Sequence, residues 1–132
     1  MHKTIRALLA AALLAGFVVS TAPAAVAKGP NPANGAWTAI DPVDDSALTL
    51  LVTGSTSRGG IVLFDDRATV ACPVADSAAV AFGRGSWSSD TLTVTVRIRC
   101  LGEPNPGPVE LTFDYDAATD TITSGAEVYT RR

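Results

Sequence analysis

The side chains that most often act as nucleophiles, general bases or metal ligands are scarce in this sequence. Its one histidine is His2, its two cysteines are Cys72 and Cys100, and its only lysine after residue 3 is Lys28. Without a histidine beyond residue 2, the chain lacks the commonest general base and both the Ser–His and Cys–His nucleophile pairs. A carboxylate-pair hydrolase is the one familiar catalytic class that remains open. We therefore expect a non-catalytic protein without a cofactor.

The first 27 residues have the layout of a secretory signal peptide. Lys3 and Arg6 precede an apolar run over residues 7–19, and residues 25–27 (AVA) form an A-x-A cleavage site. The apolar run has about 13 residues, fewer than the about 20 that a membrane-spanning helix needs. We expect cleavage after residue 27, secretion of residues 28–132 and no membrane anchor afterwards; a retained amphipathic anchor is the alternative.

The two cysteines are predicted to form a disulfide, because exported proteins meet oxidising conditions. A zinc site would lack its usual ligands, since the mature chain has no histidine and no further cysteine. The Cys72–Cys100 bond would close a loop of about 29 residues, which the chain-entropy model values at about 3.6 kcal/mol.

The mature chain is expected to be one acidic domain. It has 132 − 27 = 105 residues, and removal of Lys3 and Arg6 leaves a net charge of 8 − 13 = −5. This balance argues against nucleic acids and anionic membranes as partners. Residues 28–35 (KGPNPANG) are predicted to be a flexible lead-in, because they contain no large apolar side chain. Residues 36–132 would form the single folded domain, which we expect to be a monomer.

Two groups of aspartates crowd predicted turns. They are Asp41, Asp44 and Asp45 in the first group, and Asp114, Asp116 and Asp120 in the second. Clustered oxygens suit calcium, but neither group has the EF-hand spacing. Because aspartate commonly bonds its own backbone in turns, we predict turn chemistry and no metal site.

Three further side chains could contact a ligand. Trp87 is a candidate binding aromatic, although a tryptophan in a strand is more commonly part of the core. Arg97 and Arg99 are interpreted as solvent-facing residues that pair with Glu110, rather than as a ligand site.

The elements that position these residues are predicted to be β-strands throughout. Residues 91–100 alternate strictly: the even positions are apolar and end at Cys100, whereas the odd positions are threonine or arginine. Cys72 is predicted to share a buried face with Val70 in a strand over 69–72. Other strands are predicted at 36–40, 47–53, 60–64, 80–87, 109–115, 120–123 and 126–131, with turns between them.

The alternation also predicts how the later strands pair. A hairpin of 91–100 with 109–115 sets Arg99 opposite Glu110 and Val96 opposite Phe113, with all apolar side chains on one face. A second hairpin would place Ile122 opposite Phe113. Eight or nine short strands with regular turns favour an all-β fold: a small antiparallel β-barrel of about eight strands, with a β-sandwich as the alternative.

The two ends of the domain resemble those of the lipocalin and calycin barrels. Gly35-Ala36-Trp37 opens the first strand in the G-x-W pattern of that family, and Arg131 ends the last strand. The resemblance implies a lipocalin-like barrel in which Trp37 plugs the closed end and Arg131 (or Arg132) covers its ring through a cation–π contact.

In size, single disulfide and barrel architecture, the chain is also similar to small exported bacterial inhibitors of metalloproteases. That similarity implies that residues 28–35 would enter a protease cleft. We therefore expect a secreted, non-catalytic β-barrel binding module for an unknown small ligand or protein, with an exported protease inhibitor, acting through its N-terminal segment or a loop, as the alternative. An interior filled by side chains would argue against the small-ligand version.

Overall fold

The computed structural model describes residues 30–72, 77–102 and 104–132. The expected signal peptide and the first two residues of the lead-in lie outside these ranges. The described part is all-β, and it contains no helix that could cross a membrane. This confirms the predicted fold class.

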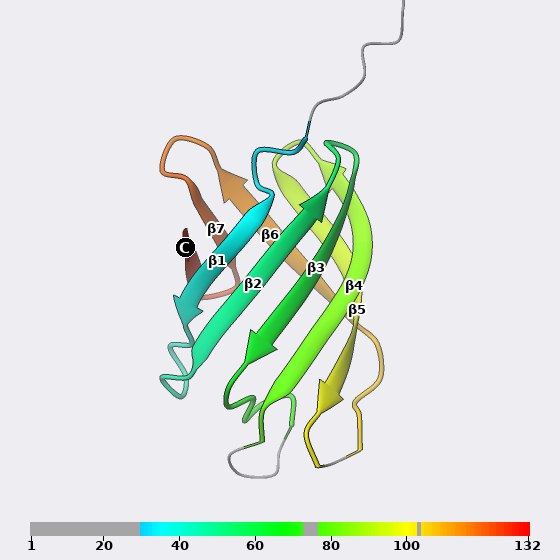
Figure 1. The fold of residues 1–132 in the computed structure, drawn as a ribbon. Helices are drawn as coiled ribbons and strands as arrows, with labels where there is room; N and C mark the ends of the chain where they lie inside the picture. Colours follow the sequence, from blue (N-terminus) through cyan, green and yellow to red (C-terminus); the bar gives the residue numbers. More distant parts are fainter. Residues whose placement is uncertain (1–29, 73–76, 103) are drawn as a thin grey trace, which may run out of the picture.

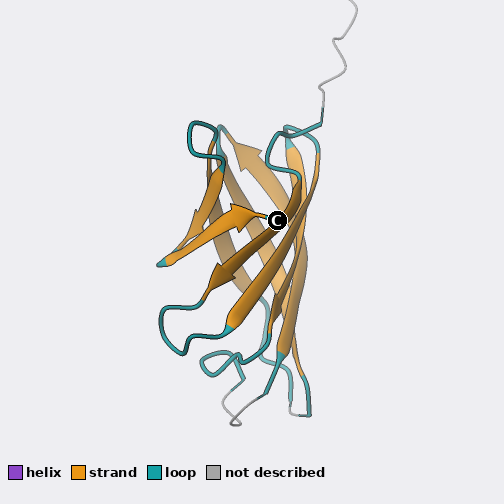
Figure 2. Ribbon diagram, turned by 60° about the vertical axis from the view of Figure 1, so that its left-hand side comes forward, coloured by secondary structure: helices purple, strands orange, loops and turns teal. Residues whose placement is uncertain are grey.

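Eight antiparallel strands form one closed barrel, in which each strand pairs with the next and β8 pairs with β1 (Figure 1). The strands are β1 (Gly35–Ile40), β2 (Ala47–Gly54), β3 (Arg58–Asp65), β4 (Ala79–Ser88), β5 (Thr91–Cys100), β6 (Val109–Asp116), β7 (Thr121–Ser124) and β8 (Glu127–Arg131). The loops gather at the two ends of the barrel (Figure 2). Closure leaves no free sheet edge, and the β-sandwich alternative is excluded.

The predicted alternation decides which side chains fill the barrel. In β5 the side chains of Leu92, Val94, Val96 and Cys100 are buried, while Arg97 on the opposite face is exposed. The other strands contribute the same way, so that the core combines side chains from every strand. Its largest fully buried members are Trp37, Tyr129, Phe113, Leu50, Leu92 and Ile122.

Two glycines let β4 curve closely over β5. A Cβ atom at Gly83 would overlap the carbonyl group of Thr95, and one at Gly85 would overlap that of Thr93. Glycine without a side chain permits this close backbone approach, which a small barrel needs in order to close.

The predicted pairing of β5 with β6 is wrong by four residues. Val96 lies opposite Val109 instead of Phe113, and Glu110 lies opposite Thr95 instead of Arg99. Barrel strands are staggered, so each runs past its neighbour at one end. Residues 97–100 therefore pair with β4 alone, and the loop 101–108 spans the offset.

The predicted β6–β7 register is also wrong, by two residues, because Ile122 lies opposite Tyr115 rather than Phe113. The predicted turn between these strands covered residues 116–119. In the structure Asp116 still pairs with Thr121, so the chain reverses over residues 117–120. Both shifts are even, so every side chain keeps its predicted face.

Residues 69–72 form a turn and not the predicted strand. The amide of Cys72 donates to the carbonyl of Ala68 at 2.8 Å, which is a helical-type turn rather than an extended chain. Val70 is consequently 81% exposed, although Cys72 is fully buried. The predicted shared face of Val70 and Cys72 is therefore wrong.

Candidate functional site

The barrel interior is occupied by side chains of its own core. The rings of Trp37 and Tyr115 meet edge to face with centroids 6.0 Å apart, and those of Phe113 and Tyr129 do so at 6.4 Å. Trp37, Phe113 and Tyr129 are also the largest fully buried side chains, and they belong to one continuous core cluster. This argues against a small ligand held inside the barrel, as calycins hold theirs.

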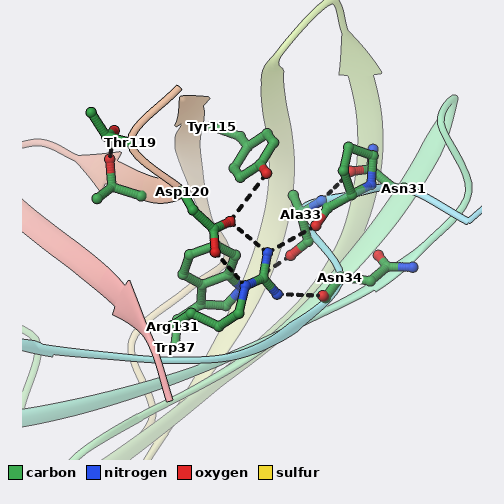
Figure 3. A network of polar contacts seen from close by, with 10 residues as sticks. Asn31, Ala33, Asn34, Trp37, Tyr115, Thr119, Asp120 and Arg131 are labelled. Carbon is green, nitrogen blue, oxygen red and sulfur yellow. Dashed lines mark hydrogen bonds and ion pairs between the residues drawn. The ribbon is translucent and has the colours of Figure 1, made fainter. Parts of the chain in front are cut away.

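The start of β1 and the end of β8 meet at one end of the barrel, called here the Trp37 end (Figure 3). The indole Nε1 of Trp37 donates to the carbonyl of Ala33 at 3.0 Å, and both residues are fully buried. The guanidinium carbon of Arg131 lies 4.1 Å from the centroid of the indole ring, within the range of a cation–π contact. The structure thus brings together the two residues that the sequence suggested for closing the barrel.

Arg131 is held in place by three different groups. Its Nη1 donates to the carbonyl of Asn34 at 2.9 Å, and its Nη2 donates to that of Pro32 at 3.0 Å. Its Nε and Nη2 also donate to the two carboxylate oxygens of Asp120, each at 2.7 Å. This bidentate geometry requires an arginine, because lysine has no planar fork.

The pKa values of two neighbouring acids are shifted at this end, for different reasons. The hydrogen bonds from Arg131 hold the pKa of Asp120 below its usual value. Desolvation raises the pKa of the Tyr115 hydroxyl, as does the bond that it donates to Asp120 at 3.1 Å. Asp120 is therefore ionised and the Tyr115 hydroxyl is neutral at pH 7. In these states Asp120 can accept the hydrogen bonds from both Arg131 and Tyr115 at the Trp37 end.

Residues 30–34 make fixed contacts with this end, whereas the sequence indicated a flexible lead-in over 28–35. Ala33 is fully buried, its amide donates to the side chain of Asn31, and Pro30 forms a β-bridge with Ser55. Two features of the sequence indicated these contacts indirectly. Asn31 is a turn-forming residue, and the tryptophan of the G-x-W pattern has to be shielded from solvent by neighbouring groups.

Protonation of Asp120 is expected to loosen the Trp37 end. Since its pKa is lowered in the fold, the stabilisation by Asp120 is complete above the unfolded pKa of about 3.9 and is lost as the pH falls through the folded value. Asp120→Asn tolerates the positive φ of 49° at this position and should therefore report on charge alone. In urea unfolding, the variant should be less stable than the wild type at pH 7, and the difference should shrink below about pH 4.

The control for this pH experiment is Asp90→Asn, because Asp90 is exposed and makes no ion pair within the described residues. Its effect on stability at pH 7 should be smaller than that of Asp120→Asn. A difference between wild type and Asp120→Asn that stays constant over this range would show that the Asp120–Arg131 pair does not stabilise the fold.

The predicted disulfide joins Cys72 to Cys100 at the opposite end of the barrel, with their Cα atoms 5.7 Å apart. It ties the β3–β4 loop to the last residue of β5. A small second core surrounds it, made of Ala68, Ala79 and the two half-cystines. The bond therefore fastens the described part of this loop to β5.

Trp87 lies on the inner side of β4, at the Trp37 end. It is partly buried against the core cluster, and its indole nitrogen sits where a side chain on Gly59 would have to be. That nitrogen is buried and has no hydrogen-bond partner among the residues described. The structure does not bring Trp87 together with the exposed arginines.

The predicted turn chemistry is observed for Asp41, Asp44 and Asp116, whereas Asp114 accepts a hydrogen bond from the Thr91 hydroxyl and Asp120 accepts bonds from Arg131 and Tyr115. Oδ1 of Asp41 accepts a bond from the amide of Val43, and Oδ1 of Asp44 accepts one from Ser46, at 2.7 and 3.0 Å. Asp116 bonds the amide of Ala118 in the same way at 2.8 Å. In the described ranges, no three acidic or cysteine side chains are grouped so that they could hold a metal ion.

The outer surface of β2, β3, β4 and β5 has a composition that the sequence analysis missed. Apolar side chains stand on its adjacent strands in register: Leu51 opposite Val62, Val62 opposite Phe82, and Phe64 opposite Val80. Arginines accompany them from β3, β4 and β5. We call this surface the arginine face; it comprises Leu51, Val62, Phe64, Val80, Phe82, Arg58, Arg84, Arg97 and Arg99.

The apolar side chains of this surface are partly exposed, and an arginine contacts one of its aromatic rings. Leu51, Val62 and Phe64 are 43%, 45% and 41% exposed. Arg99 pairs with Val80 across the strands and lies 5.7 Å from the ring centroid of Phe82, so the predicted pair with Glu110 is wrong. β2–β4 run side by side across the front of the barrel in Figure 1.

Charge is strongly segregated on this protein. The sequence has more acidic than basic side chains, yet β2, β4 and β5 contain no carboxylate, and β3 contains only Asp65 at its last position. Within the described residues, no ion pair involves Arg58, Arg84 or Arg97. The sequence signal was the unbroken apolar run 61–64, which indicates a strand that is apolar on both faces.

Comparison with protein-family models, curated proteins and solved structures found no match for this chain.

Proposed function

We propose that this chain is an exported, non-catalytic binding module that recognises a protein partner through the arginine face. The observation that carries the proposal is the contiguous apolar surface on β2–β4, which is bordered by arginines and free of outward carboxylates. Apolar patches rimmed by polar residues commonly mark protein contact sites, and arginine and aromatic residues are enriched in them. The matching partner surface is apolar and acidic.

We further propose that the barrel is lipocalin-like and that its binding surface lies on the outer face of the sheet. The Gly35–Trp37 opening and the Arg131 cover support it, because both have the geometry that the resemblance implies. The filled interior favours an external surface over an internal ligand. Export is supported by the signal-like first 27 residues and by the disulfide, which persists in oxidising compartments.

A protease inhibitor that inserts its N-terminal segment is less well supported. Arg131, Trp37 and Ser55 hold residues 30–34 against the barrel, so insertion into a cleft would break the closure of the Trp37 end. A panel of secreted metalloproteases and serine proteases, with the full mature protein and with one that lacks residues 28–35, tests this alternative. Inhibition that disappears with residues 28–35 would favour it over the arginine face.

The binding proposal is tested with surface variants that preserve the strands. Leu51→Thr/Val62→Thr removes apolar contact area at exposed positions, and threonine is a good strand former. The oxidised mature protein is immobilised and offered the other exported proteins of its native host. We expect a stoichiometric partner whose affinity for the double variant falls about tenfold or more.

The matched control is Val128→Thr, the same kind of substitution at an exposed residue of β8, away from the arginine face. It should retain the partner with unchanged affinity. Equal binding by all three proteins would show that the partner uses another surface and would refute the proposal.

A further inference from the structure

An outward-opening hollow lies at the end of the arginine face that is nearer to the Trp37 end. Its volume is about 570 Å³, and its floor is formed by glycines of β2, β3 and β4. Gly60 is central, because Thr53 lies opposite it on β2 and Arg84 opposite it on β4. A Cβ atom at Gly60 would come within 3.3 Å of the Gly83 carbonyl oxygen, 3.5 Å of the Thr53 hydroxyl and 3.7 Å of Arg84 Cγ. The missing side chain thus creates the recess.

Two arginines border the recess. Arg58 and Arg84 lie on adjacent strands in diagonal positions, since Arg58 pairs with Ser86 and Arg84 with Gly60. Diagonal neighbours of this kind are about 7–8 Å apart and can reach the same group with long side chains. Both side chains are exposed, and within the described ranges neither forms an ion pair. Two unpaired guanidinium forks beside one recess favour an oxyanion as its occupant.

An apolar groove continues from this hollow. Its volume is about 290 Å³; it shares Thr53, Gly60 and Arg84 with the hollow and extends to Leu51, Val62 and Phe82. An occupant of both hollows therefore needs an anionic group and, next to it, an apolar group. The recess accepts a group that protrudes, which fits a side chain better than the broad surface of a membrane.

We infer that this hollow is the anchor site for an acidic side chain of the partner, with an adjacent aromatic or aliphatic side chain in the Val62–Phe82 groove. The inference rests on the proposed function and specifies the chemistry of the partner. Charge complementarity carries it: the hollow has two cations and no carboxylate among its lining residues. Because the hollow is open and both arginines are exposed, it can accept a carboxylate without burying either arginine completely.

The test uses short peptides as probes and the amide and arginine Nε NMR signals of the oxidised mature protein as the readout. The probe is N-acetyl-Ala-Glu-Phe-Ala-amide, and the matched peptides carry Gln for Glu or Ala for Phe. We expect saturable shifts of the Gly60 and Arg84 signals with the first peptide. Replacing Glu by Gln should weaken binding about tenfold, because the charged hydrogen bonds are lost. Replacing Phe by Ala should weaken it about fivefold.

Protein variants locate the site. Gly60→Val should abolish the shifts, because its side chain fills the recess. An unfolding midpoint equal to that of the wild type would show that the barrel of this variant is intact. The control is Gly107→Val, because no atom lies within 4 Å of a Cβ atom at Gly107. Arg84→Gln should weaken the peptide about tenfold without depending on packing, whereas Arg132→Gln should not. Unchanged binding by both Gly60→Val and Arg84→Gln would overturn the inference.

Other occupants give distinct results. Inorganic phosphate that binds Gly60 and Arg84 as tightly as the Glu-Phe peptide would indicate a free-anion site and overturn the inference. Loss of these signals with phosphatidylglycerol vesicles, but not with the peptide, would indicate a lipid contact and would also overturn it. A peptide that does not bind, together with a partner that is still lost from Leu51→Thr/Val62→Thr, would refute the anchor site and leave the proposed function standing.

Discussion

Replacing Trp37 by alanine is expected to lower the free energy of unfolding by about 3–5 kcal/mol. Trp37 is the largest of the fully buried side chains, and it contacts the ring of Tyr115 and the guanidinium of Arg131. Its loss would leave a cavity at the Trp37 end and would deprive the buried carbonyl of Ala33 of its donor. Both effects act in the same direction.

Three further variants separate the contributions of the cavity, the hydrogen bond and the stacking contact. Trp37→Phe retains a ring but lacks the indole N–H, so it should cost less than alanine, about 1–3 kcal/mol. A double-mutant cycle of Trp37→Ala with Arg131→Met should show coupling of about 0.5–3 kcal/mol, because the two side chains stack. Urea unfolding of the oxidised protein, followed by circular dichroism, measures all four. A cost of less than about 1 kcal/mol for Trp37→Ala would show that this end does not hold the barrel closed.

Removing the disulfide is expected to cost about 3.6 kcal/mol, the second large effect. The bond joins residues 28 positions apart, and in the unfolded chain it closes a loop of that size. In the folded protein, Cys72 and Cys100 are both buried in the small second core. Cys72→Ala/Cys100→Ala avoids leaving polar groups in that core and therefore reports mainly on the crosslink.

Reduction of the wild type provides an independent measurement of the same quantity. Unfolding by urea in the presence of a reductant should shift the midpoint as much as the double alanine variant does. The reductant should not change the midpoint of the variant, which has no cysteine left. An unchanged midpoint in the wild type would show that the bond is not formed in the purified protein.

The strands could be predicted from the sequence, because alternation with a period of two residues reports directly on which side chains face the core. The register could not. The alternation of apolar and polar residues determines only whether two strands are offset by an odd or an even number of residues. The number of residues in that offset depends on the stagger of the strands in the closed barrel. Val96 therefore faces the core as predicted, but it lies opposite Val109 and not opposite the predicted Phe113.

The Trp37 end was predictable and the arginine face was not, for a physical reason. Trp37 and Arg131 stand at the first and last strands, which must be neighbours in a closed barrel. The residues of the arginine face come from four strands, so their proximity follows only from the strand pairing. The negative net charge of the chain gives no indication that arginines gather on one face. Val62 and Phe82 are outward residues in strands whose inward residues are equally apolar, so alternation gives no signal for them.

The most direct measurement of the binding surface is site-specific photo-crosslinking with benzoylphenylalanine. It replaces Val62 on the arginine face in one protein and Thr123 on the outer side of β7 in another; both positions are exposed. We expect one protein partner to be crosslinked from position 62 and not from position 123, with its attachment point next to an acidic side chain. Crosslinking of the same partner from position 123 alone would contradict the assignment of the arginine face.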